Sequence, residues 1–290
     1  MTTVPILKRS AKELYPSIIQ SLSDQKTTRY FDNSWTFAQL DEWRNADLPG
    51  ILKARYDEEG ETWLTKDELI LLMDWKLAKG KFRPTLPKLI RQNEAAQVES
   101  ITRSAFKTLL NYLQNKSFPF TDSDKKLYIS TVKDATKKAS ELRGVGPATA
   151  SLILSLAEPI SSLAPPFLSD ESFIYFVLEP TRPDTKIKYN LKEYTDEYLP
   201  AIFDILDGNN NNKEQSLVEL EKGAWSLKFY DMGKIDITAD IELPFKVEKD
   251  VLFKYIKVEP KSGKVVKEEE DKKRKHVKVE SDQVKKRKKN

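Results

Sequence analysis

The stretch Leu142-Arg-Gly-Val-Gly-Pro-Ala-Thr-Ala150 decides the fold. It lies between two segments with helical periodicity, so it predicts two helices joined by a tight turn. Its two glycines allow positive φ angles and let the backbone approach a ligand closely. Val145, between the glycines, is expected to fill the space between the two helices. Pro147 suits the first turn of the second helix, because its missing N–H needs no partner there.

The start of that second helix predicts a phosphate site. Its first backbone N–H groups have no partner within the helix and lie at the positive end of the helix dipole. Such a start binds an anionic oxygen through the backbone, whatever the net charge of the protein. The alternative is a glycine turn that joins two helices and binds nothing. The residues predicted to contact nucleic acid here are Arg143, Gly144, Val145, Gly146, Ala148 and Thr149.

The string resembles the hairpin of the helix-hairpin-helix DNA glycosylase superfamily, and the likeness extends over about residues 123–178. The resemblance implies an all-α, DNA-glycosylase-like fold whose hairpin grips the DNA backbone. It also implies an aspartate at the start of a later helix that serves base excision. Asp170 takes that place, 22 residues beyond Ala148, a spacing slightly longer than is usual in the family. Ala148 stands where strand-cleaving relatives carry a Schiff-base lysine, so the resemblance implies a monofunctional glycosylase without lyase activity.

Two earlier stretches, Trp63–Leu69 and Trp75–Pro84, resemble the Amun-type family, nuclear proteins described as candidate DNA glycosylases. The second stretch holds a cluster of cations that is expected to follow DNA phosphates across from the hairpin. The alternative is a solvated helix end whose cations favour the C-terminal dipole. The cations are Lys76, Lys79, Lys81 and Arg83. Candidate aromatic residues to hold an extruded base are Trp43, Tyr56, Trp63 and Trp75.

Composition limits the chemistry that the chain can perform. The 290 residues include no Cys and a single His, His276, near the C-terminus. Disulfides, iron–sulfur clusters, thiolate nucleophiles and imidazole bases are therefore excluded, and no metal or cofactor is expected. In an enzyme, Asp170 would stabilise the positive charge that develops on the sugar and position a water molecule. The alternative is an ordinary helix start at Ser169-Asp170-Glu171, with Ser169 as the N-cap.

Charge divides the chain into a body, residues 1–256, and a basic tail, residues 257–290. The tail has 14 Lys and Arg against seven Asp and Glu, a net charge of +7, whereas the rest has 35 against 38. The tail contains no Phe, Trp or Tyr, so it is predicted to be disordered. A mildly acidic body can bind nucleic acid only through a local basic face.

The tail also carries patterns typical of nuclear targeting and of SUMO modification. Two basic runs suit nuclear import and predict a nuclear protein with an import receptor as partner; the alternative is a solvated charged tail. The runs are Lys272, Lys273, Arg274, Lys275 and Lys285, Lys286, Arg287, Lys288, Lys289. Lys257 and Lys278 lie in aliphatic-Lys-x-Glu segments, a pattern typical of SUMO acceptors. No apolar run reaches the ~20 residues that span a bilayer, and no secretory signal is evident, so a soluble intracellular protein is expected.

Helical patterns dominate the rest of the body. Capping boxes at Thr36–Gln39 and Thr65–Glu68 predict helix starts. Three prolines predict an extended connection between about residues 158 and 169. Apolar alternation over residues 235–243 predicts one strand. Periodicity predicts helices over about 37–43, 66–79, 94–114, 123–142, 147–157, 170–178, 192–206 and 213–225.

These patterns leave three hypotheses for function. The first is a nuclear DNA-repair enzyme that hydrolyses the N-glycosidic bond of a base in duplex DNA. The second is a nucleic-acid-binding module of the same fold without catalysis. The third is a scaffold or interaction protein in which the hairpin is structural. The hairpin together with Asp170 favours the first two, and the acidic body slightly favours the third.

Overall fold

The computed structural model describes residues 4–114, 116–118, 120–207 and 215–233. They belong to one compact unit of the chain, residues 1–247. The predicted strand, the basic tail and its import and SUMO segments lie outside the described residues. Within the described residues the structure is helical, with a single isolated β-bridge between Tyr30 and Trp35, which confirms the prediction of a mainly α fold. No helix in these ranges has the length and apolar character to cross a membrane.

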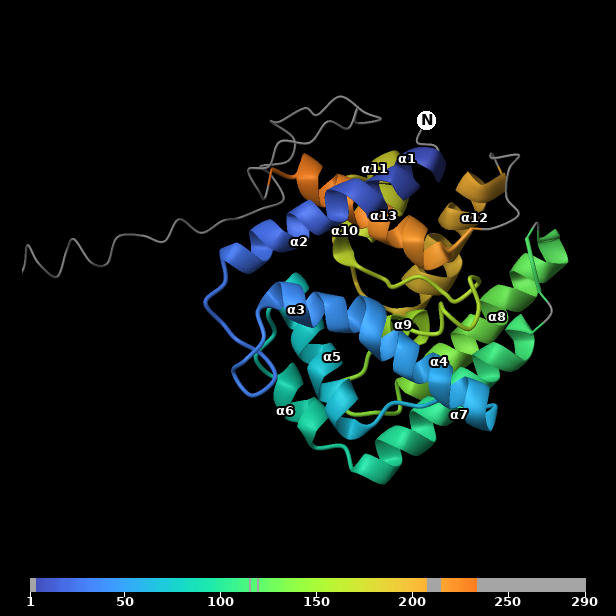
Figure 1. Cartoon of the computed structure of the whole chain (residues 1–290). Coiled ribbons are helices and arrows are strands. Elements are labelled where there is room, and N and C mark those ends of the chain that lie inside the picture. Colours follow the sequence, from blue (N-terminus) through green and yellow to red (C-terminus); the bar gives the residue numbers. More distant parts are fainter. Residues whose placement is uncertain (1–3, 115, 119, 208–214, 234–290) are drawn as a thin grey trace, which may run out of the picture. The chain divides into compact units, whose positions relative to one another are not determined.

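The helices are joined by connections of varied length, with longer segments before Phe37 and before Asp170 (Figure 1). Those of the first half are α1 (Val4–Arg9), α2 (Tyr15–Asp24), α3 (Phe37–Glu42), α4 (Leu48–Glu59), α5 (Lys66–Lys79), α6 (Leu86–Arg91) and α7 (Ala95–Leu113). Those of the second half are α8 (Asp122–Ala139), α9 (Pro147–Ser155), α10 (Asp170–Phe173), α11 (Glu179–Thr181), α12 (Leu199–Asp207) and α13 (Leu217–Asp231).

The hairpin predicted from the sequence forms between α8 and α9. The apolar stripe of α8, formed by Tyr128, Val132, Ala135 and Ala139, is buried, and α8 packs on α7. Helix α9 is buried from Ala148 to Ser155, so the core anchors it, while Gly146 in the turn is exposed. Gly144 has φ +79°, and a Cβ added there would lie 3.0 Å from Leu89 Cβ at the end of α6. The turn therefore needs glycine both for its left-handed backbone and for its close contact with α6.

The first and last helices of the described residues pack together. Helices α1 and α2 lie against α13 (Figure 1). A Cβ at Gly223 of α13 would lie only 2.1 Å from the carbonyl oxygen of Leu7, so glycine permits the close contact between α13 and α1. The Ser10 hydroxyl donates to the carbonyl oxygen of Gly223 at 3.2 Å. These contacts fix α13, which supplies Trp225 to the cavity described below.

Four helical segments of the described chain contain a π-helical turn, and each turn is followed closely by a proline. The turns are Ser10–Leu14, Trp43–Asp47, Ile174–Leu178 and Glu193–Tyr198, and the prolines are Pro16, Pro49, Pro180 and Pro200. Proline lacks an N–H and clashes with the carbonyl four residues before it. The wider i→i−5 bonding of a π turn gives that ring room, so the helix continues through the proline.

A π turn explains one of the predicted helix ends that was wrong. The helix expected to end at Trp43 continues through its π turn and through α4 to Glu59. The helix expected over residues 213–225 begins at Leu217 and ends at Asp231. The N-terminal helices α1 and α2 and the short α6 were not predicted at all. The capping boxes at Thr36 and Thr65 are confirmed, with both reciprocal bonds present in each.

Candidate functional site

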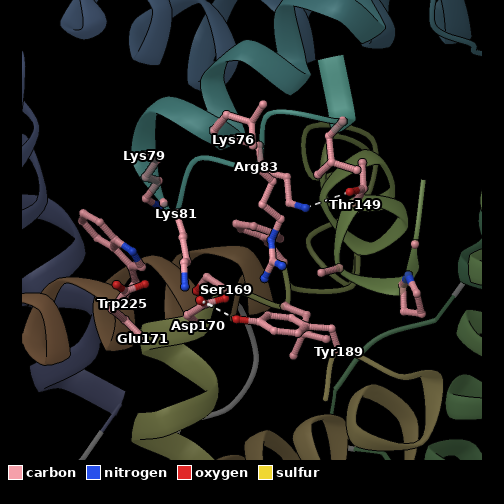
Figure 2. Close-up of a pocket in the computed structure, with 18 of the residues that line it drawn as sticks. Lys76, Lys79, Lys81, Arg83, Thr149, Ser169, Asp170, Glu171, Tyr189 and Trp225 are labelled. Atoms are coloured by element: carbon pink, nitrogen blue, oxygen red, sulfur yellow. Dashed lines mark hydrogen bonds between the residues drawn. The ribbon is translucent and has the colours of Figure 1, made fainter. Parts of the chain in front are cut away.

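A cavity of about 360 Å³ lies where α5, the α8–α9 turn and α10 meet (Figure 2). Its wall combines the end of α5 and the loop after it, the turn and first residues of α9, the segment leading into α10, and the loop before α12. It brings together three groups that the sequence places far apart: the hairpin, the basic cluster and Asp170. Among its lining residues are Lys76, Lys79, Lys81, Arg83, Gly144, Gly146, Ala148, Thr149, Phe167, Ser169, Asp170, Glu171, Lys188, Tyr189 and Trp225.

Residues of the hairpin contribute to the wall of this cavity. Gly144, Gly146 and Ala148 all line it, and no hydrogen bond from their N–H groups to another described residue is found. Three amides predicted to face an anion are instead satisfied by the protein. The N–H of Arg143 donates to Asn93 Oδ1 at 2.8 Å, that of Val145 to the carbonyl of Leu142, and that of Thr149 to the carbonyl of Gly146.

These bonds correct part of the predicted anion site. Asn93 Nδ2 also donates to the carbonyl of Arg143 at 3.0 Å, so a side chain preceding α7 fixes the turn from both sides. The Arg143 side chain is exposed but does not line the cavity, and Val145 is buried as the plug between the helices. The available amides are therefore those of Gly144 in the turn and of Gly146 and Ala148 at the start of α9.

The predicted basic cluster lines the cavity but is only partly a surface feature. Lys81 and Arg83 are exposed on the loop after α5, and Lys188 adds a further exposed cation from the loop before α12. Lys76 is partly buried, and its ammonium donates to Thr149 Oγ1 at 2.8 Å (Figure 2). This hydrogen bond ties the cluster to the first turn of α9.

Lys79 is neither the exposed phosphate-contacting cation that the sequence predicted nor the solvated cation of the alternative. Its side chain is buried, and its ammonium lies 3.9 Å from the ring centre of Trp225 and 5.0 Å from that of Tyr15. Burial lowers the pKa of Lys79 to about 8, although the nearby carboxylates Glu221 and Asp41 oppose that change. This residue belongs to the inner wall of the cavity rather than to a surface that tracks phosphates.

Asp170 opens into the same cavity as the hairpin amides. It is the first residue of α10 and is mostly shielded from water. Burial, and then the adjacent Glu171, raise the pKa of the Asp170 carboxyl, whereas Tyr189, Lys76 and Arg83 lower it. A carboxyl group with a raised pKa in a cavity of mainly positive charge is a candidate for acid–base or electrostatic chemistry.

Tyr189 is a site residue that the sequence did not reveal. Its hydroxyl donates to Oδ2 of Asp170 at 2.7 Å (Figure 2), and the Arg83 guanidinium lies 5.0 Å from its ring centre. Burial, and then Asp170, raise the pKa of the Tyr189 hydroxyl, which therefore stays protonated and able to donate. Nothing in the local sequence distinguishes this tyrosine, because its role depends on a loop that folds back over α10.

The helix start at Ser169 differs from an ordinary N-cap. Ser169 has the extended backbone of a cap residue, but its hydroxyl accepts no hydrogen bond from a backbone N–H of α10. The hydroxyl bonds instead with two side chains, those of Glu221 in α13 and of Ser172 within α10 itself. The predicted alternative of a side-chain cap at Ser169 is thus not the arrangement found, and α13 fixes the position of Asp170.

None of the four aromatic residues suggested for base binding lines the cavity. Trp75 is buried and donates from Nε1 to Asp41, and the Trp63 ring lies 3.6 Å from the Arg103 guanidinium. The aromatic side chains that do line the cavity are Phe167, Tyr189 and Trp225. Trp225 follows Asp170 by 55 residues in a separate helix, so only the tertiary packing brings it to the site.

The charged residues that line the cavity are mainly basic, although the body as a whole is mildly acidic. Five Lys and Arg side chains line the cavity, against the two acids Asp170 and Glu171. This arrangement suits an anionic ligand, with a carboxylate placed beside it. No group of three or more His, Cys, Asp or Glu in the described part of the chain is arranged to hold a metal ion. No protein-family model, curated protein or solved structure matches the chain.

Proposed function

We propose that this chain binds duplex DNA through the α8–α9 hairpin and hydrolyses the N-glycosidic bond of a nucleotide extruded into the cavity. The observation that carries the proposal is the shared cavity of Asp170 and the amides of Gly144, Gly146 and Ala148. These amides and the cations around them would hold backbone phosphates. A nuclear location, with import through the basic runs of the tail, belongs to the same proposal.

The chemistry assigned to Asp170 is electrostatic. As the base leaves, positive charge develops on the sugar, and a carboxylate beside it lowers the energy of that transition state. Lys76 and Arg83 favour the ionised form that this role requires. The volume of about 360 Å³ lies within the range of roughly 300–1,000 Å³ typical of small-ligand sites.

The competing function is a binding module of the same fold without catalysis. The bond from Tyr189 to Asp170 favours it, because that carboxylate already has a partner and is mostly shielded from water. In this version the hairpin and the cations hold DNA, and Asp170 stabilises the loop before α12.

Asp170→Asn separates the two functions. Duplexes containing uracil, alkylated bases or mismatches are incubated with the protein, and abasic sites are detected as alkali-sensitive breaks. We expect the wild-type chain to release a base from one class of duplex and Asp170→Asn to lose that activity while retaining DNA affinity. Asp134→Asn, which changes an exposed carboxylate outside the cavity, serves as the matched control.

The outcomes decide between the readings. If no duplex in the panel loses a base but binding persists, the module is the better description. If Asp170→Asn releases bases as fast as the wild-type chain, Asp170 has no part in the chemistry.

A further inference from the structure

Lys76 has the surroundings of a reactive amine rather than of a fixed cation. Its side chain lines the cavity, and its one hydrogen bond within the described residues is to the neutral hydroxyl of Thr149. No carboxylate of the described chain lies within ion-pair distance of its Nζ atom. Lys228 is a useful contrast, because its buried ammonium is paired with Asp231 at 2.6 Å and with Glu179. An ion pair of that kind stabilises the charged ammonium, whereas a neutral hydroxyl can hydrogen-bond with either the ammonium or the neutral amine.

The burial of Lys76 makes the neutral form accessible. Burial lowers the pKa of Lys76 to about 8, while Asp170 opposes and Arg83 reinforces that change. With such a pKa, about a tenth of the amine is unprotonated at pH 7, far more than for a solvated lysine. Desolvated lysine amines are nucleophiles that form imines with carbonyl compounds.

The cavity also holds a group able to complete the reaction. Asp170 lines the same cavity as Lys76. The two groups are close enough for each to influence the pKa of the other. An amine for addition and a carboxylate for proton transfer are the two groups that an aldehyde-bearing sugar needs for elimination.

We propose that Lys76 is a catalytic amine that attacks the aldehyde carbon of an abasic deoxyribose in the cavity and thereby cleaves the DNA strand. This activity rests on the proposed function, because base excision would produce that sugar at this site. Position 148 at the start of α9 is alanine and offers no amine, so the proposal assigns this reaction to a lysine of α5.

Each step balances in atoms and electrons. Nζ of Lys76 adds to C1′ of the ring-opened sugar, and loss of one water gives the imine. The Asp170 carboxylate takes a proton from C2′, the C3′–O bond breaks, and the 3′ phosphate leaves with the electron pair. Water then hydrolyses the imine, which restores the amine of Lys76, and Asp170 releases its proton to solvent. No oxidant or reductant is required.

The experiment uses the full chain and a duplex with a single preformed abasic site. Borohydride reduces an imine to a stable covalent adduct, and tryptic mapping of the cross-linked protein by mass spectrometry identifies the lysine. We expect the adduct on Lys76 and its formation to increase as pH rises from 7 to 9. In Lys76→Arg, which keeps the charge but cannot form an imine, the adduct falls to the level of a protein-free control.

Two further variants test the assignment. Lys53→Arg, which alters an exposed lysine of α4 outside the cavity, is expected to form the adduct like the wild-type chain. Asp170→Asn is expected to form the reducible imine but to cleave the strand more slowly. Mapping of the wild-type adduct is independent of the variants, so the proposal remains testable even if Lys76→Arg fails to fold.

An adduct on Lys79, an adduct confined to the lysines of the basic tail, or no adduct at all overturns the proposal. Because the abasic sugar is supplied ready-made, the result is independent of base excision. Base release without an adduct on Lys76 leaves the proposed function intact and rejects this inference. An adduct on Lys76 without base release on any duplex supports this inference and rejects the proposed base excision.

Discussion

The Tyr189 hydroxyl donates a hydrogen bond to Oδ2 of Asp170 at 2.7 Å, and the Arg83 guanidinium lies over the same tyrosine ring. Tyr189 has φ +57°, a left-handed conformation that a bulky residue adopts only where surrounding contacts hold it there. Tyr189 therefore links Asp170 of α10 to Arg83 in the loop after α5. Loss of its hydroxyl should change the ionisation of Asp170.

Tyr189→Phe is expected to raise the pKa of Asp170 further. The hydroxyl stabilises the ionised carboxyl, so its loss favours the protonated form and leaves the burial effect less opposed. The titration of the Asp170 carboxyl, followed by carbon NMR of the labelled side chain, then moves to higher pH. If base excision is observed, the acidic limb of its pH profile moves in the same direction.

The control for this prediction is Tyr56→Phe, since Tyr56 bonds with Gln114 outside the cavity. That variant should leave the titration of Asp170 unchanged. An unchanged titration in Tyr189→Phe would mean that the Tyr189 bond contributes nothing to the state of the acid.

Lys79→Met is expected to remove a pH dependence of stability. The pKa of Lys79 is about 8 in the folded chain and near 10.5 in the unfolded one, so between these values only the unfolded chain keeps the proton. The free energy of unfolding therefore rises with pH in this window, by at most about 1.4 kcal/mol per pH unit. The variant should lack this contribution, while Lys76 contributes equally to both proteins.

Urea denaturation at pH 7, 8 and 9.5 tests the Lys79 prediction. We expect the variant to gain most relative to the wild-type chain at pH 7, where the wild type must bury an ammonium, and the difference to shrink at pH 9.5. Lys53→Met changes an exposed lysine and should give a constant difference. A constant difference for Lys79→Met would contradict the lowered pKa.

The hairpin was predictable because its determinants are local. Two glycines, a proline at a helix start and the apolar stripe of α8 are each fixed by spacing along the chain. The same holds for the capping boxes, which need only residues three positions apart. The resemblance related Asp170 to the hairpin only through function, and no local pattern relates the two, so their place in one cavity comes from the structure.

The remaining features depend on context that the sequence pattern does not carry. Helices α2, α4 and α12 each contain a proline near their start, and the preceding π turn that accommodates it has no recognisable sequence signature. Lys79 resembles a solvated lysine at a helix end until Trp225 of α13 covers it. Tyr189 reaches Asp170 only because its loop folds back toward α10. The contact of the short helix α6 with the turn at Gly144 likewise depends on tertiary packing.

Gly144→Ala is expected to destabilise the fold by about 1–3 kcal/mol. A left-handed backbone costs a non-glycine residue roughly 1–2 kcal/mol, and the new Cβ would lie 3.0 Å from Leu89 Cβ. Gly50→Ala is the matched control, because Gly50 lies in α4 with open space around its Cβ and alanine favours helix. Urea denaturation should show a loss for the first variant and no loss for the second; equal stabilities would contradict the required left-handed turn.

Gly146→Ala is expected to weaken DNA binding without disturbing the fold. Gly146 has φ −94°, which alanine adopts freely, and no heavy atom lies within 4 Å of the added Cβ. The methyl group would, however, obstruct a phosphate approaching the amides at the start of α9. Because hydrogen bonds to charged groups contribute about 1.5–3 kcal/mol, we expect the affinity for a short duplex to fall about tenfold.

The salt dependence distinguishes this amide contact from a cation contact. Gly146→Ala should leave the slope of log K against log salt unchanged, because a backbone amide displaces no counterion. Arg83→Ala should reduce the magnitude of that slope by about 0.9, the value expected for one phosphate contact. Unchanged affinity in Gly146→Ala, with its stability retained, would mean that the exposed amides of the hairpin do not contact DNA, and the remaining binding would have to be assigned to side-chain cations.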